Sequence, residues 1–205
     1  MRRLGGYPAP MLILASASPR RRHLLGTTGL RFEVVPAEID ETPVAGEGPE
    51  TLCERLAREK AVHVARTRGA GVFVLGSDTL VTIDGEILGK PRDPAHAEVL
   101  LGRLMGRTHR VVTGIAVASD GARSLRSRTV ESRVTLRAAG VDEIRDYVAG
   151  GEPLDKAGAY ALQGEGGRFV TAVAGSETNV IGLPLEETLA LLRESGFGLG
   201  GSGRP

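Results

Sequence analysis

The sequence is poor in aromatic residues and in cysteine. Its 205 residues include no tryptophan, three tyrosines, four phenylalanines and one cysteine, Cys53. A single cysteine excludes a disulfide within the chain and is typical of a protein in a reducing compartment. The few aromatic side chains do not cluster near the arginines, which argues against a platform for stacking the bases of single-stranded nucleic acid.

Neither sign of charge is in excess. The chain has 26 lysine and arginine residues against 25 aspartate and glutamate residues, a formal net charge of +1. Such a balance creates no overall field that attracts nucleic acid or a membrane surface, so any basic site must be local. No stretch approaches the roughly 20 apolar residues of a membrane span. We therefore expect a cytoplasmic protein without nucleic-acid or membrane partners.

The first 18 residues, MRRLGGYPAPMLILASAS, are similar to a weak signal peptide. Their apolar part, Met11–Ala15, is shorter than the about 7–15 residues of such peptides, which argues against that interpretation. No internal repeat or linker divides the chain, whose length is typical of one domain. We expect an N-terminal extension at residues 1–10, a single domain at residues 11–195 and a flexible glycine-rich tail at residues 196–205.

The order of hydrophobic patterns predicts an α/β fold with a mixed sheet, because strands and helices alternate early and a long hairpin follows. Strands are expected at residues 11–16, at 31–36, from 72 onward with a break at Gly76–Asp78 and a hairpin at Asp84–Gly85, and as two long strands joined at Asp120–Gly121. Helices are expected from Pro19, from Pro49 to about Arg68, from Pro94 to about Met105, at Val141–Ala149 and from Pro184.

The first predicted helix begins with an unusual charge pattern. Ser18 and Pro19 are typical of a helix start, yet Arg20, Arg21 and Arg22 follow at once. The helix dipole disfavours cations at this end, but it makes the end a good anion site. Arginines there strengthen such a site, and their mutual repulsion is relieved when phosphate binds. We expect Arg20 and Arg21 to bind phosphate and Arg22 to be a solvated surface charge.

Lys60 interrupts the apolar face of the helix predicted from Pro49. A lysine on such a face is costly unless it is paired or extends its ammonium to solvent. Extension to solvent is the structural alternative; we favour a lysine that reaches an anion in a cleft. The rest of that face is apolar: Leu52, Cys53, Leu56, Ala57, Ala61 and Val64.

Asp78 follows an apolar strand and is expected at the mouth of the sheet. Alone it is equally typical of a turn, but beside a phosphate-binding surface it is a candidate base or Mg²⁺ ligand. Glu38, Asp40 and Glu41 offer further oxygen ligands from the acidic loop before Pro49.

Other patterns carry less weight. The four histidines have no zinc-like spacing, and no P-loop or dinucleotide motif follows a strand. The glycine-rich segment Gly164–Gly167 is similar to a phosphate loop, but we interpret it as a flexible turn.

Eight ordered blocks extend over nearly the whole chain, from about Leu12 to Glu194. They are LASASPRRRHLL, EIDET, LAREKA, VLGSDTLV, ILGKPRD, GRTHRVVTG, EPLDKAGAYALQGEGG and VIGLPL. In these blocks the sequence resembles the Maf family of nucleoside triphosphate pyrophosphatases, whose fold is related to that of the ITP/XTP pyrophosphatases. The resemblance implies an elongated mixed sheet flanked by helices, with two lobes around a cleft, and a homodimer.

The resemblance also implies a reaction and a set of site residues. The reaction is hydrolysis of a nucleoside triphosphate to the monophosphate and pyrophosphate with Mg²⁺ or Mn²⁺. Asp78 corresponds to the proton acceptor of the family, and Asp78 and Glu41 are the expected metal ligands. The other phosphate-binding and catalytic positions fall on Ser16, Arg20, Arg21, Glu41, Lys60 and Lys90.

Three positions distinguish branches of the family, and here they hold Arg20, Thr79 and Gln163. These are similar to the dTTP/UTP branch and unlike the 7-methyl-GTP branch, which implies an enzyme that removes pyrimidine nucleotides, including modified ones, from the nucleotide pool. The alternative is a regulatory protein of septum formation and cell division that only senses nucleotide. A sensor needs the arginines and lysines but no base, so the presence of Asp78 and Glu41 together with Lys60 and Lys90 favours the enzyme.

Overall fold

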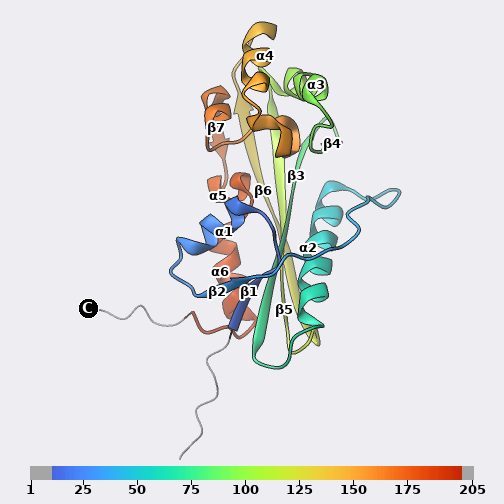
Figure 1. The fold of residues 1–205 in the computed structure, drawn as a ribbon, viewed down its shortest axis with the longest axis vertical. Helices are drawn as coiled ribbons and strands as arrows, with labels where there is room; N and C mark the ends of the chain where they lie inside the picture. The colour runs from blue at the N-terminus through green and yellow to red at the C-terminus, as the bar shows by residue number, and fades with distance from the viewer. Residues whose placement is uncertain (1–10, 200–205) are drawn as a thin grey trace, which may run out of the picture.

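The computed structural model describes residues 11–199, so the N-terminal extension expected at residues 1–10 lies outside the described residues. A mixed sheet of seven strands runs along the long axis of this part of the chain (Figure 1). The order is β2-β1-β3-β5-β6-β7, with β4 also paired to β3; β1 is parallel to β2 and β3, and the other pairs are antiparallel. The strands are β1 Met11–Leu14, β2 Phe32–Val34, β3 Val72–Ile83, β4 Glu86–Leu88, β5 Thr108–Ser119, β6 Ser124–Leu136 and β7 Val170–Ala174.

Helices flank this sheet, which confirms the predicted α/β class. Ser18 and Asp93 cap α1 and α3 through their side-chain oxygens, as their positions before proline suggest. No helix within residues 11–199 combines the length and the apolar character needed to cross a membrane. The helices are α1 Pro19–Gly26, α2 Pro49–Ala65, α3 Pro94–Leu104, α4 Val141–Ala149, α5 Glu177–Ile181 and α6 Leu185–Glu194, with 3₁₀ turns η1 Glu152–Asp155, η2 Ala157–Ala159 and η3 Glu165–Phe169.

The hydrophobic core is divided along the sheet into two halves. At one end, Leu101 of α3 and Tyr147 of α4 pack with Phe169. At the other end, Ala61 of α2 belongs to one cluster and Leu191 of α6 to another. The long strand β3 contributes to all three clusters, so the two halves are joined by continuous sheet.

Strand β3 does not break where the sequence suggested. The expected break at Gly76–Asp78 is wrong: both residues lie inside a continuous strand of 12 residues, and Asp78 is therefore not at the end of a strand. A Cβ at Gly76 would lie 2.1 Å from the carbonyl oxygen of Ala57, and one at Gly114 on β5 would lie 2.2 Å from that of Cys53. These glycines let the backbone of α2 rest directly on β3 and β5.

Packing also extends past the expected domain boundary at residue 195. Phe197 is only 6% exposed, and its ring lies edge-on to that of Phe73, with 5.3 Å between centroids. Leu199 packs against the same cluster. The flexible tail expected from residue 196 is therefore not seen at 196–199, and residues 200–205 lie outside the described part of the chain.

A buried histidine links β5 to the segment after η2. His109 is 2% exposed; its Nε2 lies 2.7 Å from Oη of Tyr160, and its Nδ1 has no hydrogen-bond partner among residues 11–199. Burial lowers the pKa of His109 to about 4. The ring is therefore neutral in the folded protein at pH 5, whereas in the unfolded chain it gains a proton below about pH 6.5.

We expect the free energy of unfolding to decrease as the pH is lowered, because of this histidine. Between pH 7 and pH 5 the unfolded chain binds the proton and the folded protein does not, which costs about 2 kcal/mol of stability over that interval. Denaturant unfolding of the wild type and of His109→Phe at both pH values measures the effect, and the variant should lose most of this dependence. An unchanged dependence in the variant would assign the effect to another group.

Candidate active site

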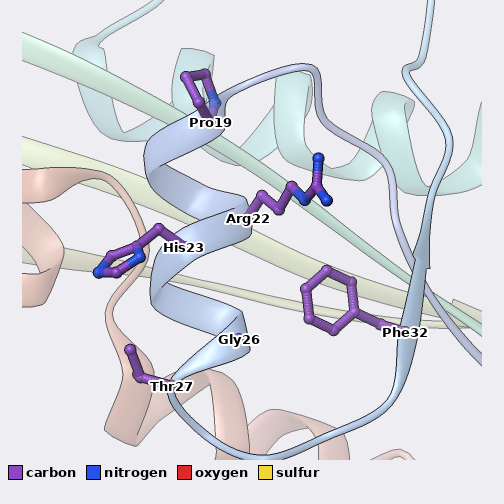
Figure 2. A pocket seen from close by; sticks show the side chains of 6 residues that line it. All are labelled: Pro19, Arg22, His23, Gly26, Thr27 and Phe32. Atoms are coloured by element: carbon purple, nitrogen blue, oxygen red, sulfur yellow. The ribbon is translucent and has the colours of Figure 1, made fainter.

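An open hollow lies on one side of α1, and it does not contain the predicted site. Arg22, His23 and Phe32 line it, together with Pro19, Gly26 and Thr27 (Figure 2). Both Arg22 and His23 are exposed there. The position of Arg22 agrees with its interpretation as a surface charge.

The predicted site residues line another cavity, of about 630 Å³, which includes Arg20 and Arg21. The sheet explains its position. Strand β3 pairs with β5 along most of its length, but on its other side it pairs with β1 only as far as Leu75 and with β4 only from Val81. Within residues 11–199, residues 76–80 therefore have no strand neighbour on that side. The cavity lies along this open edge, so side chains in the middle of β3 reach it.

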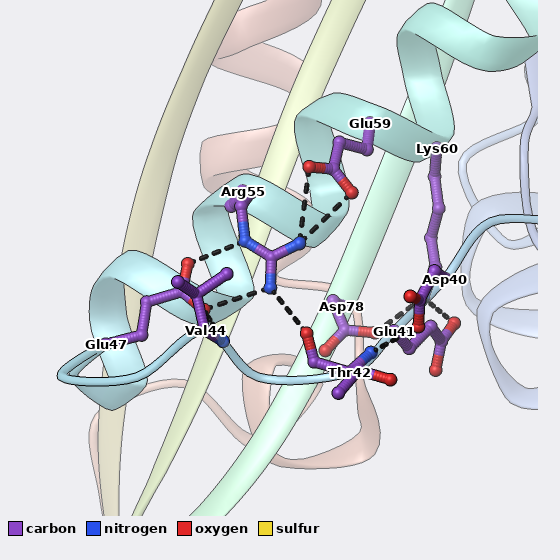
Figure 3. Close-up of polar contacts among 9 residues, drawn as sticks. All are labelled: Asp40, Glu41, Thr42, Val44, Glu47, Arg55, Glu59, Lys60 and Asp78. Atoms are coloured by element: carbon purple, nitrogen blue, oxygen red, sulfur yellow. Dashed lines mark hydrogen bonds and ion pairs between the residues drawn. The ribbon is translucent and has the colours of Figure 1, made fainter.

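Lys60 and two carboxylates occupy one wall of the cavity (Figure 3). The Nζ atom of Lys60 lies 2.6 Å from Oδ1 of Asp78 and 2.6 Å from Oε1 of Glu41. The side chains of Lys60 and Asp78 are 8% and 11% exposed, whereas that of Glu41 is 57% exposed. The anions that Lys60 reaches are thus carboxylates of the protein itself, and the lysine does not extend to solvent.

The basic residues around the cavity keep Glu41 ionised. Partial burial acts to raise the pKa of Glu41, but the hydrogen bond and charge of Lys60, together with the charges of Lys90 and Arg21, hold it below its ordinary value. The carboxylate therefore stays negative across the neutral pH range.

The two carboxylates also fit a divalent cation, provided that a ligand supplies more oxygens. No group of three or more histidine, cysteine, aspartate or glutamate side chains within residues 11–199 forms a metal site. Asp78 and Glu41 each use one oxygen to accept from Lys60, which leaves Oδ2 and Oε2 available. Mg²⁺ is commonly bound by one or two carboxylates together with substrate phosphates and water, and this donor set fits that pattern.

Arg21 is held rigidly beside these carboxylates. Its Nε donates to the carbonyl oxygen of Gly182 at 2.9 Å, one terminal nitrogen to Oγ1 of Thr79 at 3.0 Å, and the other to Oγ of Ser16 at 3.4 Å. A guanidinium has five N–H donors, so two remain for an anion. Thr79 also lies 3.0 Å from Oγ1 of Thr113. Ser16, Arg21 and Thr79 thus form one hydrogen-bonded unit joining α1, β3 and the end of α5.

Segments far along the chain complete the lining of the cavity. Arg20 faces Asp155 at 3.7 Å, and the exposed residues Lys90 and Gln163 line the same cavity. The cavity therefore brings together every residue that the sequence analysis assigned to catalysis or substrate binding. It also contains residues that the analysis did not assign: Asp155, Lys156 and Tyr160. The signal for the first two is the charged segment 152–156, which together with the arginines of the first helix suggests one cleft lined by arginine, lysine and aspartate.

The glycine-rich segment Gly164–Gly167 is not free to bind phosphate. The carboxylate of Glu152 accepts hydrogen bonds from the backbone N–H groups of Glu165, at 2.9 Å, and Gly166, at 3.0 Å. These donors are already used within the protein, and the segment forms the N-terminal part of η3.

Comparison with known proteins identifies the family of this chain. The family model described as Maf-like protein matches residues 11–195. The chain belongs to the Maf-like protein family. The resemblance inferred from the motifs is therefore confirmed, and the match covers the whole sheet and all of the cavity residues.

Individual relatives of this Maf-like protein are similar over nearly their full length. The dTTP/UTP pyrophosphatase of Myxococcus xanthus is 54% identical over 189 residues, 92% of this chain and 94% of the relative. That of Anaeromyxobacter dehalogenans (strain 2CP-C) is 50% identical over 194 residues, 93% and 97% of the two chains. Among solved structures, the Ham1 protein of Staphylococcus aureus overlaps with a TM-score of 0.45 at 16% identity, covering 62% of this chain and 71% of that one.

We expect Lys60→Met to destabilise this Maf-like protein. Removing the ammonium leaves the buried Asp78 beside Glu41 without a counter-charge, which costs about 3 kcal/mol at pH 8 if the pair behaves as other buried pairs do. Chemical unfolding measures the loss, and the double variant Lys60→Met/Asp78→Asn should recover more than half of it. A single variant as stable as the wild type would show that Lys60 does not compensate these carboxylates.

Proposed function

We propose that the protein hydrolyses nucleoside triphosphates to the monophosphate and pyrophosphate, with dTTP and UTP as preferred substrates. The observation that carries the proposal is the cluster of Lys60, Asp78 and Glu41 in a cavity whose other walls bear Arg20, Arg21 and Lys90. Carboxylates for proton transfer thus lie beside cations for a polyphosphate. The names of the relatives, dTTP/UTP pyrophosphatase, support the same reaction and substrates.

Substrate binding depends on the cations around the cavity. Arg21 has two free N–H donors in a fixed orientation, and Arg20 extends from the same helix start toward Asp155. Lys90 is an exposed residue of the cavity lining, so its side chain can adjust to the triphosphate as it binds. A cavity of about 630 Å³ is within the usual range for a small-molecule ligand. Fixed donors of this kind bind the phosphate oxygens and stabilise charge that develops during the reaction.

Asp78 is the proposed general base. Its Oδ1 accepts a hydrogen bond from Lys60, which orients the carboxylate, so Oδ2 is available to take a proton from water. The water oxygen then forms a bond to the α-phosphorus, and the bond from that phosphorus to the bridging oxygen breaks. Pyrophosphate leaves with the bonding electrons, and the arginine and lysine side chains neutralise its charge. A divalent cation held by Asp78 and Glu41 would supply further neutralisation of the phosphate oxygens.

Recognition of the base is assigned to Gln163. It is an exposed residue of the cavity lining, and its amide offers both a donor and an acceptor to the edge of a pyrimidine. The hydroxyl of Thr79 is hydrogen-bonded to Arg21 and Thr113. Its proposed contribution to substrate binding is therefore to hold Arg21 in place.

The family resemblance further supports a cytoplasmic homodimer that acts on nucleotides rather than on nucleic acid. Sedimentation velocity at micromolar concentration tests the dimer, and a sedimentation coefficient of a 21.5 kDa monomer would contradict it.

We expect Asp78→Asn to fold but to lose catalysis. Asparagine has nearly the same shape but cannot take a proton, so kcat should fall by about 10²–10⁴-fold. Pyrophosphate release measures the loss, and melting temperature with and without nucleotide tests folding and binding. The matched control is Asp84→Asn, the same change at an exposed carboxylate paired with Arg107 outside the cavity. A stable Asp78→Asn protein within threefold of the wild-type rate would contradict the mechanism.

Substrate preference gives an independent test. The kcat/KM values for UTP and dTTP should exceed those for ATP and GTP, and Gln163→Ala should reduce this ratio by about tenfold, the effect of one lost hydrogen bond to the base. Glu165→Gln, at a nearby exposed residue, should leave the ratio unchanged. A wild-type preference for purine nucleotides would refute the assignment of substrate.

A further inference from the structure

Glu41 belongs to a loop that has no regular secondary structure. The loop, residues 38–47, is part of the connection between β2 and α2, and its residues are mostly exposed. The side chain of Glu41 is 57% exposed, yet its carboxylate meets Lys60 at 2.6 Å. Holding one side chain of an exposed loop at a fixed point costs conformational entropy, so other contacts must restrain the loop backbone.

Arg55 of α2 supplies these contacts (Figure 3). One terminal nitrogen of its guanidinium donates to the carbonyl oxygen of Thr42 at 3.1 Å, and Thr42 directly follows Glu41. The same guanidinium binds both carboxylate oxygens of Glu47, at 2.6 Å and 2.9 Å. Its remaining terminal nitrogen lies 3.2 Å from both carboxylate oxygens of Glu59, one turn along α2. Arg55 thus fixes the loop beside Glu41 and again at its far end.

The Arg55–Glu47 contact differs from an ordinary surface ion pair. The side chain of Glu47 is only 8% exposed and that of Arg55 is 25% exposed. The second oxygen of Glu47 also accepts from the backbone N–H of Val44 at 3.0 Å, and the N–H of Glu47 donates to the carbonyl of Val44 at 3.0 Å. A contact through both carboxylate oxygens fixes the geometry of the two side chains. Single exposed ion pairs, by contrast, contribute little to stability.

Only two side chains from outside the loop form hydrogen bonds or ion pairs with it, among residues 11–199. They are Lys60, which binds the carboxylate of Glu41, and Arg55, which binds the neighbouring backbone and Glu47. Both project from α2, which itself rests on β3 beside Asp78. The helix α2 therefore fixes the position of the loop relative to β3 through the side chains of Lys60 and Arg55.

We propose that Arg55 is a positioning residue that holds Glu41 in the active site. The proposal rests on the proposed function of Glu41. Without Arg55, Lys60 alone must hold the loop, and Glu41 spends less time beside Asp78. Small displacements of groups around a reacting phosphate lower the rate strongly, so the effect of Arg55 should be kinetic and should pass through Glu41.

Kinetics of Arg55→Met test this dependence. We expect kcat to fall by about 10-fold to 100-fold, with a smaller change in KM, because the arginines and lysine that bind the triphosphate are untouched. Arg55→Lys, which keeps the charge but cannot contact all three partners, should recover part of the rate. In a Glu41→Gln background, Arg55→Met should reduce the rate by less than threefold further. Unchanged kinetics, or a loss that adds fully to that of Glu41→Gln, would overturn the proposal.

A second measurement is independent of catalysis. A glutamyl endopeptidase cleaves after Glu41 and Glu47 only when the loop opens, so cleavage in Arg55→Met should be at least tenfold faster than in the wild type. The matched control is Arg58→Met on the same helix; Arg58 contacts Glu54 and Ser127 and is 49% exposed. Cleavage of the control should stay within twofold of the wild type.

The two measurements separate two kinds of failure. Equal cleavage of wild type and Arg55→Met would overturn the role of Arg55 whatever the activity. A wild type that releases no pyrophosphate from any triphosphate would overturn the proposed function, and the cleavage rates would still report whether Arg55 holds the loop that carries Glu41.

Discussion

The contact between α2 and the sheet backbone is the constraint on which the site depends. At Gly76 and Gly114 the helix lies so close to β3 and β5 that no side chain fits between them. This approach brings Lys60 from the apolar face of α2 to Asp78, which lies two residues beyond Gly76 on the same face of β3. A larger residue at either glycine would push the helix away and separate the ammonium from its carboxylate.

The open edge of β3 accounts for the rest of the site. Because the pairing with β1 stops at Leu75 and the pairing with β4 covers only Val81–Ile83, the middle of a central strand faces a cavity instead of another strand. Alternate side chains of this segment then serve two clusters: Asp78 meets Lys60, while Thr79 meets Arg21 and Thr113. Charged side chains of α1, of α2 and of the segments that contain Lys90 and Asp155 line this gap. They reach the middle of β3 although β3 itself does not end there.

Local rules explain what could be predicted from the sequence. Ser18 and Asp93 cap helices because their side chains accept nearby N–H groups, and Asp84–Gly85 turns a hairpin because both residues adopt positive φ. The isolated lysine on an apolar helix face predicted a cation that reaches an anion in a cleft, but its partners, the carboxylates of Glu41 and Asp78, were not predicted. By contrast, Gly76 was interpreted as a strand break, because a glycine that permits close helix packing and one that ends a strand look alike in sequence.

The sequence by itself determined the fold class, the capped helix starts, the family and the residue types of the site, because these follow from short-range patterns and motifs. Only the tertiary structure decided how those residues meet. Three sets of contacts join segments whose proximity depends on packing. They are the contacts of Lys60 with its two carboxylates, the hydrogen bond from Arg21 to Gly182, and the hydrogen bonds of Arg55 to the loop that contains Glu41. The same holds for β7, which was not predicted as a strand and pairs with β6 more than 30 residues away in sequence. Contacts of this kind leave no periodic trace in the chain, since each partner satisfies its own local pattern equally well without the other.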